Sequence, residues 1–172
     1  MRTRLVEPGD AAALAAIYNV EVAEASVTFD LVARTLQEQQ RWIDEHRGAY
    51  LALVAVDDDP ALGASGARDE TVVGFASISA FRDRPAYATT VEDSVYVHRR
   101  ARGRGVGRQL LADLLDAARD AGFHSVVGRI VGQNETSIRL HEACGFEVVG
   151  VEREVGRKHG RWLDVVEVQR IL

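Results

Sequence analysis

The sequence predicts one domain of mixed α/β (α+β) class, with a twisted, mostly antiparallel sheet of about seven strands and helices on both faces. Three observations lead to this prediction. Short apolar or alternating runs predict strands, and apolar patterns with a helical period lie between them. Only one strand–helix–strand crossover interrupts an order that otherwise consists of hairpins. The 172 residues suit a single domain, residues 1–172, with its own core.

Cap and turn residues mark most of the expected elements. Thr35 and Glu38 fit a capping box, and Gly122 and Gly145 are placed to close helices. In chain order we expect a strand over residues 2–7, a helix capped by Asp10, a helix from Thr35 to near Gly48, strands over 50–57, 71–81 and 89–97, a helix over 106–121, a strand over 125–131, a helix over 134–144, and strands over 146–155 and 163–171. Residues 58–70 are rich in Asp, Gly, Ala and Ser, which predicts a flexible connection that affects surface shape only. We expect a turn over residues 156–162.

Composition argues against several classes of partner. The net charge is -5, which does not favour binding to nucleic acid or to an anionic membrane. No apolar stretch approaches the length of about 20 residues that spans a bilayer. Residues 1–10 lack the apolar region of a secretory signal, so we expect a cytoplasmic protein. The single cysteine, Cys144, excludes an internal disulfide, and no Cys/His/Asp cluster has the spacing of a metal site.

The glycine-rich segment over residues 99–108 carries the strongest local signal. Gly103, Gly105 and Gly107 alternate between a strand and a long helix, among several arginines. Glycine lets a ligand approach the main chain closely, and a helix start presents unpaired N–H groups. Together these features predict a cradle for phosphate or pyrophosphate. The pattern is neither Gly-x-Gly-x-x-Gly nor a loop for nucleotide triphosphates. The alternative is a flexible turn before a solvated, basic helix end.

The segment Arg102-x-x-Gly105-x-Gly107, placed after Ser94-Val95-Tyr96-Val97, resembles the pyrophosphate loop of the GNAT acetyltransferases. Further segments resemble one branch, the phosphinothricin / methionine sulfoximine N-acetyltransferases: Ile17-Tyr18-Asn19, Thr28-Phe29, Thr90-Val91-Glu92, Leu140-His141-Glu142 and Lys158-His159-Gly160-Arg161-Trp162-Leu163-Asp164. The resemblance covers nearly the whole chain. It implies a GNAT fold, a homodimer, and direct acetyl transfer from acetyl-CoA to the α-amino group of a small amino-acid analogue.

The resemblance also implies where the ligands bind. Acetyl-CoA is expected in a V-shaped gap between the strands at 89–97 and 125–131. The residues expected to bind it are Val95, Tyr96, Val97, Gly103, Arg104, Gly105, Val106, Gly107, Arg108 and Asn134. The substrate pocket is expected to include Pro85, Ala86 and Tyr87. Arg82 and Arg84 either pair with an anionic group of the substrate or lie in an exposed loop.

Two residues are candidates for catalysis. An ammonium must lose a proton before it attacks a thioester, and Glu92 is the candidate base. If its strand alternates, Glu92 shares a face with Ser94 and Tyr96. Backbone N–H groups, Val95 first, are expected to stabilise the oxyanion. His141 is the candidate for a supporting proton transfer, with a structural histidine as the alternative. Asp93 stands where this branch commonly has a small or neutral residue, and we expect it to change the charge of the pocket mouth.

Two rival functions remain open at this point. A protein N-terminus or a polyamine is an acceptor within the same reaction class, and such an enzyme should show an open groove for a protein substrate. An acyl-CoA-binding sensor on the same fold would bind acetyl-CoA without turning over an amine.

Overall fold

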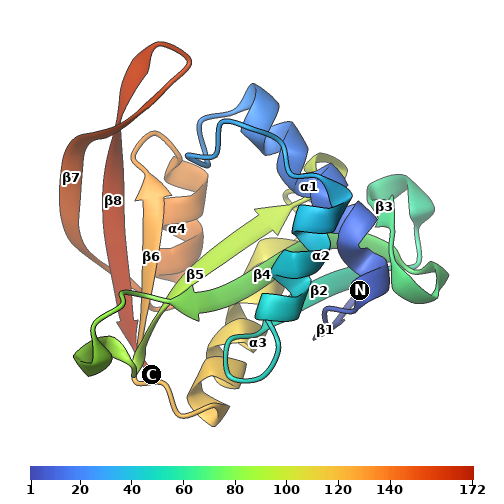
Figure 1. The fold of residues 1–172 in the computed structure, drawn as a ribbon, viewed down its shortest axis with the longest axis horizontal. Helices are drawn as coiled ribbons and strands as arrows, with labels where there is room; N and C mark the ends of the chain where they lie inside the picture. The colour runs from blue at the N-terminus through green and yellow to red at the C-terminus, as the bar shows by residue number, and fades with distance from the viewer.

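A twisted sheet forms the centre of the computed structural model, which describes residues 1–172 (Figure 1). Its strands are β1 (Arg2–Leu5), β2 (Ala52–Asp57), β3 (Ala64–Ser65), β4 (Thr71–Ala80), β5 (Thr90–Val97), β6 (Ser125–Val131), β7 (Glu147–Lys158) and β8 (Arg161–Ile171). They lie in the order β1-β2-β4-β5-β6-β8-β7, with β3 paired to β4. All pairs are antiparallel except β5 and β6, which confirms the predicted mixed sheet.

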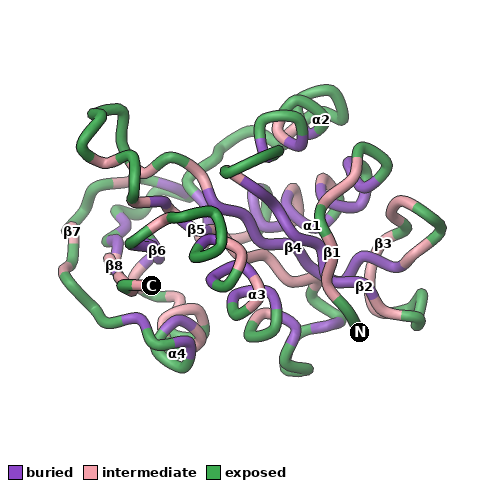
Figure 2. The backbone as a smooth tube through the Cα atoms, turned by 90° about the horizontal axis from the view of Figure 1, so that it is seen from below, coloured by how far each residue is buried: buried purple, intermediate pink, exposed green.

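Helices cover both faces of the sheet, as the sequence predicts. The helices α1 (Ala11–Glu24) and α2 (Leu36–Glu45) lie on one face, and α3 (Val106–Asp120) and α4 (Glu135–Ala143) lie on the other (Figure 2). Each pair covers its own core. Leu110, Leu111, Leu114 and Leu115 of α3 pack on one face of the sheet, as expected from their helical spacing. None of the helices combines the length and the apolar character needed to cross a membrane.

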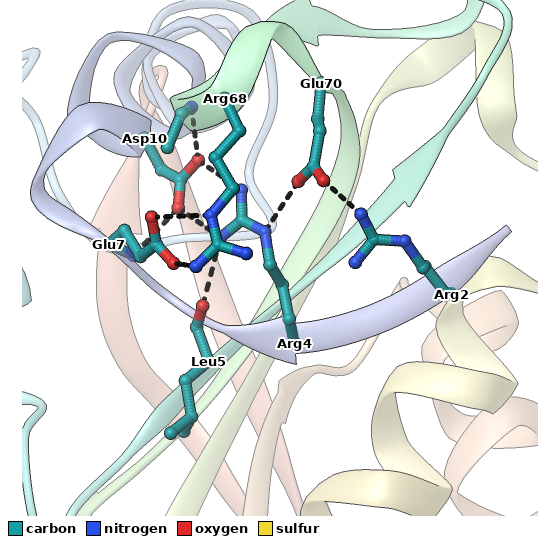
Figure 3. A network of polar contacts seen from close by, with 8 residues as sticks. Arg2, Arg4, Leu5, Glu7, Asp10, Arg68 and Glu70 are labelled. Carbon is teal, nitrogen blue, oxygen red and sulfur yellow. Dashed lines mark hydrogen bonds and ion pairs between the residues drawn. The ribbon is translucent and has the colours of Figure 1, made fainter.

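The start of α1 differs from the prediction. Asp10 precedes the helix, but its side chain makes no capping hydrogen bond. Instead its buried carboxylate pairs with Arg4 at 2.8 Å and accepts hydrogen bonds from the backbone N–H groups of Glu7 and Ala67, each at 2.8 Å (Figure 3). Arg4 also binds Glu70 at 2.7 Å. This network ties residues 58–70 to β1 and the start of α1.

Residues 58–70 are therefore more ordered than a flexible connection. They contain β3 and two 3-10 turns, Pro60–Leu62 and Ala67–Asp69. The Arg100 guanidinium donates to the Ala61 carbonyl at 3.4 Å, so the segment also contacts the turn before the glycine-rich loop. The expectation that it affects surface shape only is wrong for this reason.

The last hairpin also departs from the prediction. Residues 156–162 do not form a turn, because β7 runs to Lys158 and β8 begins at Arg161. The reversal takes place at His159 and Gly160, which have φ values of 49° and 75°. Gly156 lies within the strand. A Cβ atom there would lie 2.5 Å from the Phe29 ring, so close packing explains this glycine.

A buried amide on α2 gives a prediction about stability. Gln39 is fully buried, and neither side-chain polar atom has a hydrogen-bond partner. An unsatisfied buried polar group costs about 1–3 kcal/mol. Gln39→Met keeps the length of the side chain and removes this cost, so we expect a higher midpoint of thermal unfolding. The exposed neighbour Gln40→Met is the control. Destabilisation by Gln39→Met would show that the amide is satisfied in solution.

Candidate active site

The only parallel strand pair separates partway along its length. Pairing of β5 with β6 ends at Asp93 and Gly128, whereas β5 stays paired with β4 as far as Val97. The backbone of β5 beyond Asp93 therefore borders a cleft of about 430 Å³ between the two strands. Beyond this point the β6-facing backbone groups of β5 have no strand partner. They are free to bind a ligand with an amide-containing arm.

The glycine-rich loop closes one end of this cleft. Gly103 and Gly105 have φ values of 73° and 81°, and no atom lies within 4 Å of a Cβ placed on either. The loop backbone is thus open to a ligand, and α3 begins at Val106 with its first N–H groups unpaired within the helix. The buried carboxylate of Glu21 holds Arg99 at 3.0 Å and Arg102 at 2.8 Å. These features fit the pyrophosphate of a CoA thioester.

A second, smaller pocket of about 330 Å³ opens on the α1 and α2 side of the sheet. Aromatic side chains form much of its wall, namely Tyr18, Phe29, Trp42, Phe75 and Tyr96. The polar groups Glu92, Ser77, Ser79, Ser94, Arg34 and Arg129 also line it. The two spaces meet where β5 and β6 part, because both are lined by Val27, Asp93, Ser94, Tyr96, Arg129 and Val131.

Glu92 lies in the small pocket on the face of β5 that its alternation predicts. It shares that pocket with Ser94 and Tyr96, whereas Val91 belongs to the core under α3. Burial raises the pKa of Glu92, the nearby charge of Arg129 lowers it, and the carboxylates of Asp93, Glu167 and Glu152 raise it; the net pKa lies above its usual value. A carboxyl group with a raised pKa, in a pocket that opens into the cleft, is suited to accept a proton.

The charge of Arg129 gives a titration prediction. Its guanidinium forms ion pairs with Glu152 and, at 3.6 Å, with Glu167, and it opposes the rise in the pKa of Glu92. We expect Arg129→Met to raise the pKa of Glu92 further, because one cation is lost among three carboxylates. A carbon-13 NMR titration of the Glu92 carboxyl measures this shift. Arg139→Met, which removes an exposed arginine on α4, is the control. An unchanged Glu92 titration in Arg129→Met would contradict the assignment.

His141 and Asp93 form a buried pair beside the cleft. Nε2 of His141 lies 3.0 Å from Oδ2 of Asp93, and Nδ1 lies 2.7 Å from the Ser137 carbonyl oxygen. Both ring nitrogens thus face acceptors. Burial lowers the pKa of His141, but the hydrogen bond and charge of Asp93 and the Ser137 carbonyl together raise it above its usual value. Asp93 is 5% exposed and lines both the small pocket and the cleft, so its effect on the charge of the pocket mouth stays a prediction.

Known proteins resemble the chain over nearly its whole length. Residues 14–146 match the Acetyltransferase (GNAT) family. A phosphinothricin N-acetyltransferase of Streptomyces coelicolor is 41% identical over 97% of this chain and 95% of its own. An L-methionine sulfoximine/L-methionine sulfone acetyltransferase of Salmonella typhimurium is 36% identical over 98% of this chain and 93% of its own. The chain belongs to the GNAT acetyltransferase family.

Solved structures agree with this membership. A phosphinothricin acetyltransferase from Sinorhizobium meliloti, in complex with acetyl-CoA, superposes with a TM-score of 0.89 at 35% identity and covers 99% of this chain and 88% of its own. The predicted GNAT fold and the predicted acyltransferase class are confirmed.

Most residues that the sequence predicts for the cofactor lie together in this GNAT acetyltransferase. Those that line the cleft are Val95, Tyr96, Val97, Gly103, Gly105, Val106, Gly107, Arg108 and Asn134. Arg104 flanks the glycines but is not among the lining residues. Asn134 also caps α4, because its Oδ1 accepts from the Ser137 N–H at 3.2 Å.

The residues predicted for the substrate are placed differently. Pro85, Ala86 and Tyr87 form a short 3-10 turn between β4 and β5, and they line neither the cleft nor the small pocket. Arg82 lies over the rings of Phe81 and Tyr87 in the same loop. The residues that do line the small pocket include Tyr18, Trp42 and Arg34, which sequence reasoning did not assign to a site. The only available signal was the resemblance of the segments around Tyr18 and Thr28 to the family.

Proposed function

We propose that this GNAT enzyme transfers an acetyl group from acetyl-CoA to the α-amino group of a small amino-acid analogue of the phosphinothricin, methionine sulfoximine and methionine sulfone class. One observation carries the proposal: a small pocket containing Glu92 opens into the acetyl-CoA cleft where β5 and β6 part. The names of the related enzymes from Streptomyces coelicolor and Salmonella typhimurium support this class of acceptor. A volume of about 330 Å³ suits a small molecule better than a protein chain.

The residues of the chain have the following roles in this proposal. The glycine-rich loop and the first turn of α3 bind the pyrophosphate, and the exposed backbone of β5 orients the thioester. Glu92 takes a proton from the acceptor ammonium, directly or through water, and the freed amine attacks the thioester carbonyl carbon. The Val95 N–H donates to the oxyanion. As the C–S bond breaks, the buried Asp93–His141 pair gives a proton to the leaving thiolate, and the acceptor nitrogen loses its second proton, which returns to the pair through water.

Thiol release from acetyl-CoA tests this function. The panel contains phosphinothricin, methionine sulfoximine, methionine sulfone, common amino acids, polyamines and short peptides. Turnover concentrated on the first three supports the proposal. Turnover confined to peptides or polyamines would keep the chemistry and reject the acceptor class. Binding of acetyl-CoA without turnover of any amine would favour the sensor.

We further propose that the enzyme works as a homodimer in the cytoplasm. The exposed valines Val149, Val151 and Val155 on the edge strand β7 support a self-association surface. Sedimentation velocity at several protein concentrations tests the dimer, and a single monomeric species throughout would reject it.

A further inference from the structure

One wall of the acceptor pocket consists of a loop without regular secondary structure. This loop, residues 25–35, joins α1 to α2 and supplies Val27, Thr28, Phe29 and Arg34 to the pocket (Figure 1). Irregular surface backbone opens easily unless other elements hold it. Three segments noted in the sequence have no chemical role so far: those around Tyr18, around Thr28 and around Lys158. All three meet at this wall.

Lys158 holds the middle of the loop. It is the only lysine in the chain, which contains 20 arginines. Its side chain is buried, at 4% exposure, and its Nζ donates to the Thr28 carbonyl oxygen at 2.9 Å. Burying an ammonium is unfavourable unless hydrogen bonds compensate. A hydrogen bond from a charged donor is also stronger than one between neutral groups. Lys158 is therefore a firm attachment between β7 and a loop 130 residues earlier in the chain.

The shape of β7 places a second contact beside the first. The Phe29 ring lies against the Gly156 backbone, where a Cβ atom would be only 2.5 Å from the ring. The register between β7 and β8 shifts between Glu152 and Gly156. Glu154 has a φ of 52°, and its N–H donates to the Asp164 carboxylate at 2.8 Å. The irregular stretch of β7 therefore comes directly before Gly156 and Lys158, the two residues that contact the loop.

The helix α1 holds the loop from the other side. The Tyr18 hydroxyl lies 2.8 Å from the Thr28 hydroxyl and donates to Asp30 at 2.6 Å. The Asn19 amide bonds both the N–H and the carbonyl of Arg34, each at 2.9 Å. Thus α1 holds the loop at Thr28, Asp30 and Arg34, and the β7–β8 hairpin adds contacts at Thr28 and Phe29.

From these contacts we infer that Lys158 is a positioning residue for the acceptor amine. It keeps the loop over residues 25–35 closed as a wall of the pocket, and Gly156 supports it by leaving room for Phe29. The inference rests on the proposed function, because it assigns the small pocket to the acceptor. Lys158 does not line that pocket and takes no part in the chemical step.

Steady-state kinetics test the inference by separating the two substrates. A hydrogen bond to a charged group contributes about 1.5–3 kcal/mol, so we expect Lys158→Met to raise the KM of the acceptor by about tenfold or more. In the same variant, the KM of acetyl-CoA should change by less than about twofold. Lys158→Arg should recover part of the loss, because a guanidinium also donates to a carbonyl. Arg161→Met is the control, since Arg161 pairs with Lys158 across the hairpin and is exposed.

A second measurement does not depend on the identity of the acceptor. Amide hydrogen exchange of residues 25–35 should be faster in Lys158→Met and in Gly156→Ala than in the wild type, and unchanged in Arg161→Met. Gly156→Ala also provides the test if Lys158→Met does not fold. If exchange of the loop is faster in the variants but the enzyme acetylates no small amine, Lys158 still attaches the loop and the proposed function is rejected. Unchanged exchange, or an equal rise in both KM values, would overturn the inference.

Discussion

Glu92→Gln is expected to lower kcat/KM at neutral pH by a factor of about 10²–10⁴, the usual contribution of a positioned general base. Gln has nearly the shape of Glu but cannot take a proton from the acceptor ammonium. Glu92 lies in the small pocket and is not among the residues that line the acetyl-CoA cleft, so the affinity for acetyl-CoA should stay close to that of the wild type. Initial rates and isothermal titration calorimetry measure the two quantities.

Stability separates a catalytic role for Glu92 from a structural one. Burial raises the pKa of Glu92, so its ionised form is disfavoured in the folded state. Because the folded pKa lies above the unfolded one, ionisation of Glu92 destabilises the fold as pH rises through this interval. The neutral Gln avoids that cost, so the variant should be at least as stable as the wild type at neutral pH. Glu147→Gln, on the exposed face of β7, is the matched control.

The acid side of the activity profile provides another test of the base. A base must be deprotonated, so wild-type activity should fall as pH drops through the raised pKa of Glu92. An acid limb that persists unchanged in Glu92→Gln, or a variant with full activity, would show that another group accepts the proton.

Local signals explain why much of the fold was predictable. The capping box at Thr35 and Glu38 involves residues three apart, and the structure has both of its hydrogen bonds. The leucines of α3 likewise reveal their buried face through spacing alone. By contrast, β3 has only two residues, and contacts far along the chain hold its segment, such as the Arg4 and Asp10 network. Gly156 resembles a turn signal in the sequence, but in the structure the glycine makes room for the ring of Phe29, which is distant in sequence.

The candidate site divides in the same way. The glycine-rich loop is contiguous in sequence, and nearly all its predicted residues line the cleft. The acceptor pocket combines Tyr18 of α1, Trp42 of α2 and Arg129 of β6, and no local pattern joins these residues. Strand alternation predicts that the side chain of Asp93 points to the opposite face of β5 from Glu92, so this part of its placement could be predicted. Its partner His141 lies 48 residues later, and only the fold brings the two together.

Removal of Asp93 is expected to have the largest effect on stability. Asp93→Ala leaves His141 buried without its carboxylate, and breaking a buried ion pair in this way costs about 3–5 kcal/mol. The midpoint of thermal unfolding should fall by roughly 6–20 °C for a domain of this size. Asp93→Asn should be milder, because an amide oxygen can still accept from Nε2 of His141. There is little free space beside Asp93, because a Cβ atom added at Gly128 would lie 3.0 Å from Oδ1 of Asp93.

The contribution of His141 to the pH dependence of stability should change sign in Asp93→Ala. In the wild type the pKa of His141 is raised, so its contribution to stability is complete below the unfolded value of about 6.5 and is lost as pH rises through the folded pKa. Without Asp93, burial outweighs the Ser137 carbonyl and lowers the pKa of His141 below the unfolded value. In the variant the His141 contribution should then rise as pH rises through the same region, so its stability should fall less, or rise more, with pH than that of the wild type. Urea unfolding of both proteins across this range measures the difference, and parallel curves would show that His141 and Asp93 do not share a proton in the folded enzyme.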